Sequence, residues 1–415
     1  MTITGSAISG PVGSLTVVGV SAHTALSEQA RAALAGADLV IGGQANLDLI
    51  GPAAEVETIV LGPLAPALDR LRAHQRSGGR AVVVASGDPG FFGIVRSLRV
   101  AELPCRVLPA VCSVSAAFAA AGLDWDGAVV VSAHGRELRP ALNACRAQPR
   151  VAVLTGPGAG PVELARGLAG WPRELLIAER LGLAGERITR APAPEVAARQ
   201  PSEFTDPNVV LSLTPADVLT VMRGDNQPAA APSAGWALAE SEYEHRDSMI
   251  TKAEVRAWVV ARLRPCLGRL ILDIGAGSGS VGIECALLGA AVVAVERDPE
   301  ATAVIARNAA RHGVRLRLVE GLAPAAVAGL PEADAAFVGG GGTGVVQDLV
   351  RRRVRLVVAA FAALDRALAA HEILSAGGYR VEGVQLGASR LTGLPGGSLR
   401  LTATNPVLVL TGELP

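Results

Sequence analysis

The chain has 415 residues, half of them hydrophobic and only 3% aromatic, and its 38 basic residues balance 38 acidic ones. The length suffices for two or three domains, and the absence of net charge argues against nucleic acid or an acidic membrane as a partner. No apolar run approaches the ~20 residues of a membrane-spanning helix. The first residues do not resemble a secretory signal, and the five scattered cysteines fit neither a disulfide framework nor a zinc site, so we expect a cytoplasmic protein without a metal.

In the first half of the chain, apolar strand patterns alternate with helical patterns. The predicted strands are Ser14–Val20, Leu39–Gly42, Ala81–Ala85, Cys105–Leu108, Ala128–Ser132, Val151–Thr155, Glu174–Ala178 and Val209–Thr214. The predicted helices are Ser27–Ala35, Ala65–Gln75, Gly93–Val100, Val114–Ala121 and Pro161–Ala169. This alternation is typical of α/β proteins with mostly parallel sheets.

A linker is predicted at residues 224–235, which are rich in Pro, Ala and Gly and show no periodicity. It divides the chain into two domains, 1–223 and 236–415. Residues 108–113 predict a junction between two lobes of the first domain, at about 14–110 and 113–223.

The second half shows a cleaner alternation. The predicted helices are Lys252–Arg264, Ser280–Leu288, Pro299–His312 and Leu364–Ser375. The predicted strands are Leu270–Ile274, Ala291–Glu296, Arg315–Glu320, Ala335–Gly339, Arg355–Ala360, Arg380–Leu386 and Pro406–Leu410. We therefore expect a seven-stranded doubly wound sheet, which binds ligands at the carboxyl ends of its central strands.

A glycine turn follows the first strand of this sheet. Asp273 stands near the strand end, Gly275, Gly277 and Gly279 alternate after it, and a helix pattern follows. Glycines accept positive φ, and a helix N-terminus offers free N–H groups. Glu296 ends the next strand roughly 20 residues later, where such folds place a ribose-binding acid. The alternative is a turn that only reverses the chain.

This pattern resembles the donor site of S-adenosylmethionine-dependent methyltransferases with a Rossmann-like fold. The resemblance implies that the three glycines hold the methionine portion of S-adenosylmethionine and that Glu296 binds its ribose. Glu320, Gly321 and Leu322 would then lie near the adenine.

The most distinctive segment of the first half is residues 87–93, Gly-Asp-Pro-Gly-Phe-Phe-Gly, directly after a predicted strand. Asp88 either accepts hydrogen bonds from a ligand or caps the following helix. The segment resembles the tetrapyrrole (corrin/porphyrin) methylase family. Further segments resemble the precorrin-6Y methylating branch of that family, at residues 108–115, 131–138, 154–157, 178–182 and 208–212.

Residues 244–256 of the second half resemble the first segment of the decarboxylating methylase that is the partner half of that branch. Residues 337–342 and 405–407 agree with it. The resemblance implies a cobalamin-biosynthetic enzyme that methylates precorrin-6Y at meso carbons 5 and 15 and decarboxylates a ring acetate, giving precorrin-8X. It also implies association into a homo-oligomer.

The same resemblance implies binding residues. In the first half the donor cleft would be lined by Gly87, Asp88, Phe91, Thr155 and Gly156. Candidates for the carboxylates of the tetrapyrrole substrate are Thr251, Lys252, His134 and Arg136, with Arg297 or Arg390. Lys252 is the single lysine, which indicates either a need for a compact ammonium or a chance survivor of arginine bias. The alternative role of each arginine is a surface charge, and that of His134 is a loop residue.

The first predicted strand departs from the family pattern. Ser21 and His23 stand where glycine and a small or acidic residue are expected. Their side chains either crowd the donor or the macrocycle or form a tolerated variant of the loop. One alternative is therefore that the first domain only binds tetrapyrrole and that the second alone is catalytic. Another is a methyltransferase acting on RNA or protein, which the zero net charge and the fused first half disfavour.

Overall fold

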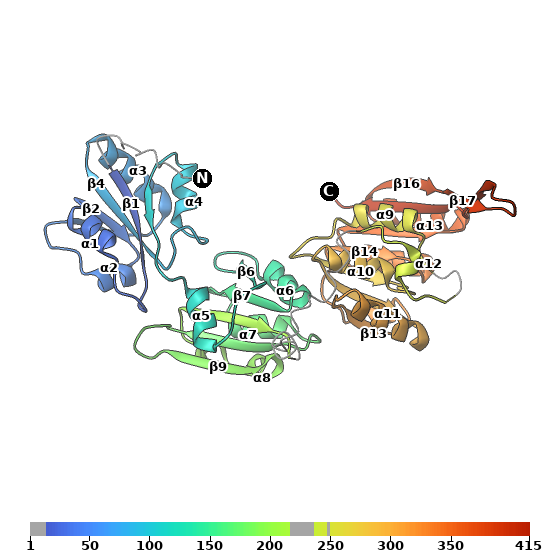
Figure 1. The fold of residues 1–415 in the computed structure, drawn as a ribbon, viewed down its shortest axis with the longest axis horizontal. Coiled ribbons are helices and arrows are strands. Elements are labelled where there is room, and N and C mark those ends of the chain that lie inside the picture. Colours follow the sequence, from blue (N-terminus) through green and yellow to red (C-terminus); the bar gives the residue numbers. More distant parts are fainter. Residues whose placement is uncertain (1–13, 216–235, 247–249) are drawn as a thin grey trace.

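The structure is a computed structural model that describes residues 14–215, 236–246 and 250–415. It contains three main sheets, drawn in blue, in green and from yellow to red in Figure 1. The predicted linker at 224–235 lies outside the described residues. Among the described residues, no helix combines the length and the hydropathy that crossing a membrane requires.

The first sheet is parallel throughout. Its five strands, in spatial order, are β3 (Glu57–Val60), β2 (Leu39–Gly42), β4 (Arg80–Ser86), β1 (Ser14–Val20) and β5 (Arg106–Leu108). Its helices are α1 (Glu28–Ala35), α2 (Gln44–Ile50), α3 (Leu64–Arg76) and α4 (Ile94–Val100). Alternate side chains of the apolar strands enter two separate cores, one on each face, so helices cover both faces.

The second sheet is an exception to the mostly parallel pairing that the sequence predicts and that the first sheet confirms. Its strands, in spatial order, are β6 (Val129–Ser132), β7 (Arg150–Leu154), β10 (Asn208–Leu213), β8 (Glu174–Glu179) and β9 (Arg187–Pro192). Only β6 and β7 pair in parallel, whereas the other pairs are antiparallel. Its helices are α5 (Ser113–Ala121), α6 (Leu138–Ala147), α7 (Pro161–Gly167) and α8 (Ala193–Ala197). Hydrophobic runs identified the strands but carried no information about their direction.

The third sheet confirms the seven-stranded doubly wound prediction. Its strands, in spatial order, are β13 (Arg317–Glu320), β12 (Ala291–Glu296), β11 (Leu270–Ile274), β14 (Ala335–Val338), β15 (Leu356–Phe361), β19 (Val407–Glu413) and β16 (Arg380–Leu386). Its helices are α9 (Ala253–Leu263), α10 (Ser280–Leu287), α11 (Pro299–Arg311), α12 (Gly342–Arg351) and α13 (Leu364–Ala376). Leu270, Leu272 and Ile274 pack with α12 and α13, whereas Ile271 packs with α9 and α10. The central strand is therefore buried on both faces, as its continuous apolar run requires.

Several elements escaped the sequence prediction. They are α2, β3, α6, α8, β9, α12 and a two-stranded hairpin formed by β17 (Ser389–Gly393) and β18 (Leu399–Ala403). Most are short, and the hairpin exposes Leu391, Leu399 and Leu401. The ten-residue helices α6 and α12 differ from these, because each buries an apolar side, which in α12 consists of Val345, Val346 and Leu349.

The second lobe packs against the third sheet at the amino ends of its strands. Trp171 lies between two guanidinium groups, with its ring centroid 4.6 Å from Cζ of Arg146 and 4.8 Å from Cζ of Arg317. Asn143 of α6 donates to the carbonyl of Gly268 at 3.0 Å. Because the predicted ligand sites lie at the carboxyl ends of the strands, this interface leaves them open.

Candidate active sites

The glycine turn of the second half adopts the backbone that its sequence predicts. Gly275, Gly277 and Gly279 have φ values of 71°, 57° and 76° between the end of β11 and the start of α10. A Cβ on Gly275 would lie 2.6 Å from the backbone of Gly340. Glycine is therefore required here both by the left-handed conformation and by the close approach of a second chain segment.

Asp273 is buried beneath this turn, at 1% exposure. Its Oδ2 accepts a hydrogen bond from the N–H of Gly282 at 2.8 Å, whereas Oδ1 has no partner among the described residues. Burial raises the pKa of this carboxyl to about 7, with a further contribution from the charge of Glu296. An unpartnered, fully buried acceptor is costly unless a ligand donates to it, so Asp273 fits a site for a cationic or hydrogen-bond-donating group.

Glu296 folds back over the turn. Its Oε2 accepts from the N–H of Gly277 at 2.9 Å, and its Oε1 accepts from the N–H groups of Arg297 and Asp298 at 2.8 and 3.1 Å. Oε2 therefore retains one lone pair for a hydroxyl donor, whereas both lone pairs of Oε1 are used by backbone N–H groups. The N–H of Gly321 donates to the carbonyl of Glu296 at 2.8 Å, which places the end of β13 beside it.

A cavity of about 610 Å³ opens between the turn and a segment that precedes α9. We call residues 236–246 the cover segment. The turn contributes Gly277 and Ser278 to the cavity wall, and the cover segment contributes Glu244 and Arg246. Glu296 also lines it, whereas Leu322 is 60% exposed and is not among the lining residues. The cavity thus brings Gly277 and Glu296 together. The other predicted donor residues, Asp273, Gly275, Gly279 and Gly321, are not among its lining residues.

Lys252 already has a partner in this structure. Its Nζ lies 3.1 Å from Oε2 of Glu240, and Nη2 of Arg390 lies 2.6 Å from Oε1 of the same carboxylate. Burial alone would raise the pKa of Glu240, but the hydrogen bonds from Arg390 and Lys252 outweigh it and lower the pKa to about 2. The carbonyl of Thr251 accepts from Arg256 at 2.8 Å. The two candidate cations are therefore held together by Glu240.

In the first half, three chain segments converge at the carboxyl ends of β1, β4 and β5. A Cβ on Gly19 would lie 2.2 Å from the carbonyl oxygen of Gly87 and 2.7 Å from the nitrogen of Ala110. Gly87 has a φ of 63°, and Asp88 accepts from the N–H of Gly90 at 2.8 Å. Asp88 therefore closes a turn and does not cap the following helix α4, whose N-cap is Gly93. The sequence analysis did not select Gly19, because a single glycine within an apolar strand gives no signal that another chain segment approaches it closely.

The second lobe supplies the opposite side of this site. Nδ1 of His134 lies 3.1 Å from the carbonyl of Thr155, and a Cβ on Gly156 would lie 2.9 Å from the same nitrogen. The structure thus brings His134, Thr155 and Gly156 together. The Thr155 hydroxyl is engaged by Asn208, at 2.6 Å from its carbonyl and 2.8 Å from its Oδ1.

An aromatic pair connects the two lobes. Phe91 packs on the core of the second lobe, and its ring meets that of Phe92 edge-on at 5.0 Å. Arg136 reaches from the second lobe to 5.6 Å from the Phe92 ring. Phe92 has a φ of 54° and is 47% exposed, so an unusual backbone holds an aromatic ring toward solvent between the lobes. The sequence singled out Phe91 and not Phe92.

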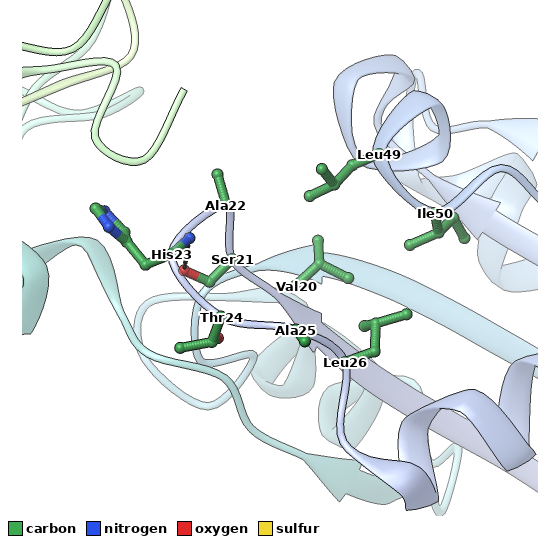
Figure 2. Close-up of a pocket in the computed structure, with 9 residues that line it drawn as sticks. All are labelled: Val20, Ser21, Ala22, His23, Thr24, Ala25, Leu26, Leu49 and Ile50. Atoms are coloured by element: carbon green, nitrogen blue, oxygen red, sulfur yellow. Dashed lines mark hydrogen bonds between the residues drawn. The ribbon is translucent and has the colours of Figure 1, made fainter. Parts of the chain in front are cut away.

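The loop at residues 19–24 takes an ordinary backbone instead of a glycine turn. Figure 2 shows it beside a cavity of about 280 Å³, with Ala22 at the tip and the His23 side chain pointing away from Leu49 and Ile50. The N–H of His23 lies 3.3 Å from Oγ of Ser21, and no residue from Val20 to Leu26 has a positive φ. A Cβ on Gly182 of the second lobe would lie 2.9 Å from the nitrogen of His23. The two lobes therefore touch at this loop.

Comparison with known proteins gives two family matches. Residues 15–197 match the Tetrapyrrole (Corrin/Porphyrin) Methylases, and residues 241–396 match the Precorrin methyltransferase domain. A precorrin-6Y C(5,15)-methyltransferase [decarboxylating] of Sinorhizobium sp is 39% identical over 344 residues, which is 79% of each chain.

Two further relatives agree with these matches. A protein of the same name from Mycobacterium tuberculosis (strain H37Rv) is 31% identical and covers 79% of this chain and 80% of its own. A probable cobalt-precorrin-6B C(15)-methyltransferase (decarboxylating) of Pyrobaculum calidifontis is 39% identical over 39% of this chain and 87% of its own.

Proposed function

We propose that each half of the chain carries one methyl-transfer site, starting from the fact that the chain belongs to the family of decarboxylating precorrin-6Y C(5,15)-methyltransferases. The reaction is methylation of precorrin-6Y at meso carbons 5 and 15 with loss of carbon dioxide from a ring acetate, a step of cobalamin biosynthesis that gives precorrin-8X. The methyl donor is S-adenosylmethionine.

The observation that carries the proposal is the glycine turn with its two acids. The donor supplies a methyl group activated by a sulfonium, so the protein must position donor and acceptor in line and exclude water. Gly275, Gly277 and Gly279 present an open backbone to the methionine portion. Asp273 offers an unpartnered buried oxygen at the same turn, and Oε2 of Glu296 retains one accepting position for a ribose hydroxyl.

Substrate recognition at the second site is assigned to Thr251 and Lys252. The ammonium of Lys252 and the guanidinium of Arg390 share Glu240, so a substrate carboxylate can replace that carboxylate as their partner. Gly321 and Leu322 border the adenine. The exposed Leu322 is available for contact with its flat face.

The first site is assigned to the cleft between the two lobes. Gly87, Asp88 and Phe91 line its first-lobe side, and Thr155 and Gly156 line the other. His134 and Arg136 are exposed beside this cleft, where they can meet substrate carboxylates.

Mass spectrometry of the products tests the proposal. The full-length chain, supplied with precorrin-6Y and S-adenosylmethionine, is expected to yield a product with two added methyl groups and one lost carbon dioxide. A product with a single added methyl group would support the alternative in which the first domain only binds tetrapyrrole. No methyl gain would refute the proposal.

A further inference from the structure

A buried asparagine on α11 joins the two walls of the second-site cavity. Asn308 is 1% exposed. Its Nδ2 donates to the carbonyl of Ser278 at 2.9 Å and to the carbonyl of Glu244 at 2.8 Å, and its Oδ1 accepts from the N–H of Glu244 at 2.7 Å. Ser278 belongs to the glycine turn and Glu244 to the cover segment, and both line the cavity.

The rest of the cover segment is held from a different direction. Glu284 of α10 accepts from the N–H groups of Ala237 and Leu238 at 2.9 and 3.0 Å and pairs with Arg256 at 2.6 Å. These bonds fix the start of the segment against α9 and α10. Its later part is held to α11 by exposed ion pairs of Glu244 with Arg307 and of Arg246 with Asp298 and Glu300. The buried hydrogen bonds of Asn308 connect this part, at Glu244, to the glycine turn.

The chemistry of this contact requires an amide. Two carbonyl oxygens face the two N–H bonds of Nδ2, and one N–H faces Oδ1. A carboxylate of the same shape has no N–H to donate and would set negative charge against both carbonyls, which is costly at a buried position.

We propose that Asn308 is a positioning residue that sets the spacing between the glycine turn and the cover segment, and thereby the affinity of the second site for the methyl donor. The inference rests on the proposed function, because it assumes that the donor occupies this cavity. Asn308 does not contact the reacting atoms. It acts through Ser278 and Glu244.

Calorimetric titration of the full-length chain with S-adenosylhomocysteine, the demethylated donor, provides the test. In Asn308→Asp, one class of binding site is expected to weaken about tenfold or more, since both hydrogen bonds that Nδ2 donates are lost. Any second class of site is expected to keep its affinity. Methyl transfer by the weakened site should recover at saturating donor, which a general folding defect would not allow.

Asn143→Asp is the matched control. Asn143 is also a fully buried helical asparagine whose Nδ2 donates to two oxygens, those of Gly268 and Asp334, but it lies at the opposite ends of the strands. This variant should bind S-adenosylhomocysteine like the wild type. Asn308→Ser, which removes the amide without adding charge, covers the case in which Asn308→Asp does not fold.

Three results would overturn the inference. The first is an unchanged affinity for S-adenosylhomocysteine in a folded Asn308 variant. The second is an equal loss of affinity in Asn143→Asp. The third is a loss of methyl transfer by the second site that saturating donor does not restore in either Asn308 variant. Absence of binding by the wild-type chain would instead refute the proposed function.

Discussion

The two halves of the chain shape their candidate donor sites differently. In the second half, Gly275, Gly277 and Gly279 take left-handed conformations within one strand–turn–helix unit. In the first half, the corresponding loop contains no positive φ from Val20 to Leu26, and the close approach occurs between separate segments at Gly19 and Gly87. The backbone of the second-half turn is therefore encoded locally, although its packing against Gly340 is not. The first-half site depends on three strand ends and a second lobe.

The largest expected effect concerns the interface between the halves. Trp171→Ala should lower the free energy of unfolding by about 3 kcal/mol, because it removes a buried ring that packs between two guanidinium groups. Differential scanning calorimetry should show an earlier transition or two separate ones, with both methylations retained. Trp125→Ala, at a site that is 48% exposed, should change little. An unaltered melting profile in Trp171→Ala would contradict the described interface.

The next effect separates the second site from the first. Gly275→Ala places a Cβ 2.6 Å from Gly340 at a φ of 71°, and should reduce methyl transfer by the second site about 100-fold through misplacement of the turn. Product mass spectrometry should then show a single methyl gain. Gly289→Ala has a similar φ of 91° but an ordinary 3.5 Å contact, and should retain both gains. Two methyl gains at the wild-type rate in Gly275→Ala would argue against this turn as a donor site.

The reciprocal change addresses the first site. Gly19→Ala places a Cβ 2.2 Å from the carbonyl oxygen of Gly87, so the strand ends must separate. We expect the rate of methyl transfer by the first site to fall by about the same factor, roughly 100-fold. Gly62→Ala, where a Cβ meets nothing within 4 Å, is the control. If Gly19→Ala folds and still yields both gains at the normal rate, the binding-module alternative for the first domain gains support.

A smaller effect follows from the raised pKa of Asp273. Its folded-state pKa is about 7, against an ordinary value of 3.8. Below pH 3.8 the Asp273 carboxyl is protonated in both the folded and the unfolded chain, so its full contribution to the free energy of unfolding is present there. As the pH rises toward 7, the unfolded chain releases the proton and the folded chain retains it, so stability is lost.

Asp273→Asn should remove this decrease in stability with rising pH, because the amide does not titrate. The free energy of unfolding of the wild type should fall relative to the variant between about pH 4 and pH 7, by roughly 1 kcal/mol per pH unit. Urea denaturation across that range measures it. Parallel curves for the two proteins would show that the carboxyl does not titrate as proposed.

The smallest expected effect is at the substrate mouth of the second site. Lys252→Ala should raise the KM for precorrin-6Y about threefold, because a partly exposed ion pair contributes little, and should leave the KM for the donor unchanged. Steady-state kinetics at saturating donor measure this change. An increase confined to the donor KM would place Lys252 in the donor site instead.

The local features of the second half followed from the sequence. The sequence predicted a strand–turn–helix unit from the run Leu270–Ile274 and the glycines after it. It also predicted the acid beside this unit, Glu296, from its place at the end of the next strand. The sheet of seven strands followed from the same apolar periodicity. These features depend on neighbours in the chain, so short-range patterns are sufficient to predict them.

Other features were decided by tertiary structure. The pairing of Lys252 and Arg390 through Glu240 joins residues from distant parts of the sequence. The antiparallel strands of the second lobe, the Gly19 contact with Gly87 and the bonds of Asn308 to both cavity walls likewise arise from long-range packing. A single sequence specifies which residues are apolar, charged or small, but the partners of those residues are selected only when the folded chain closes its loops and buries its polar groups.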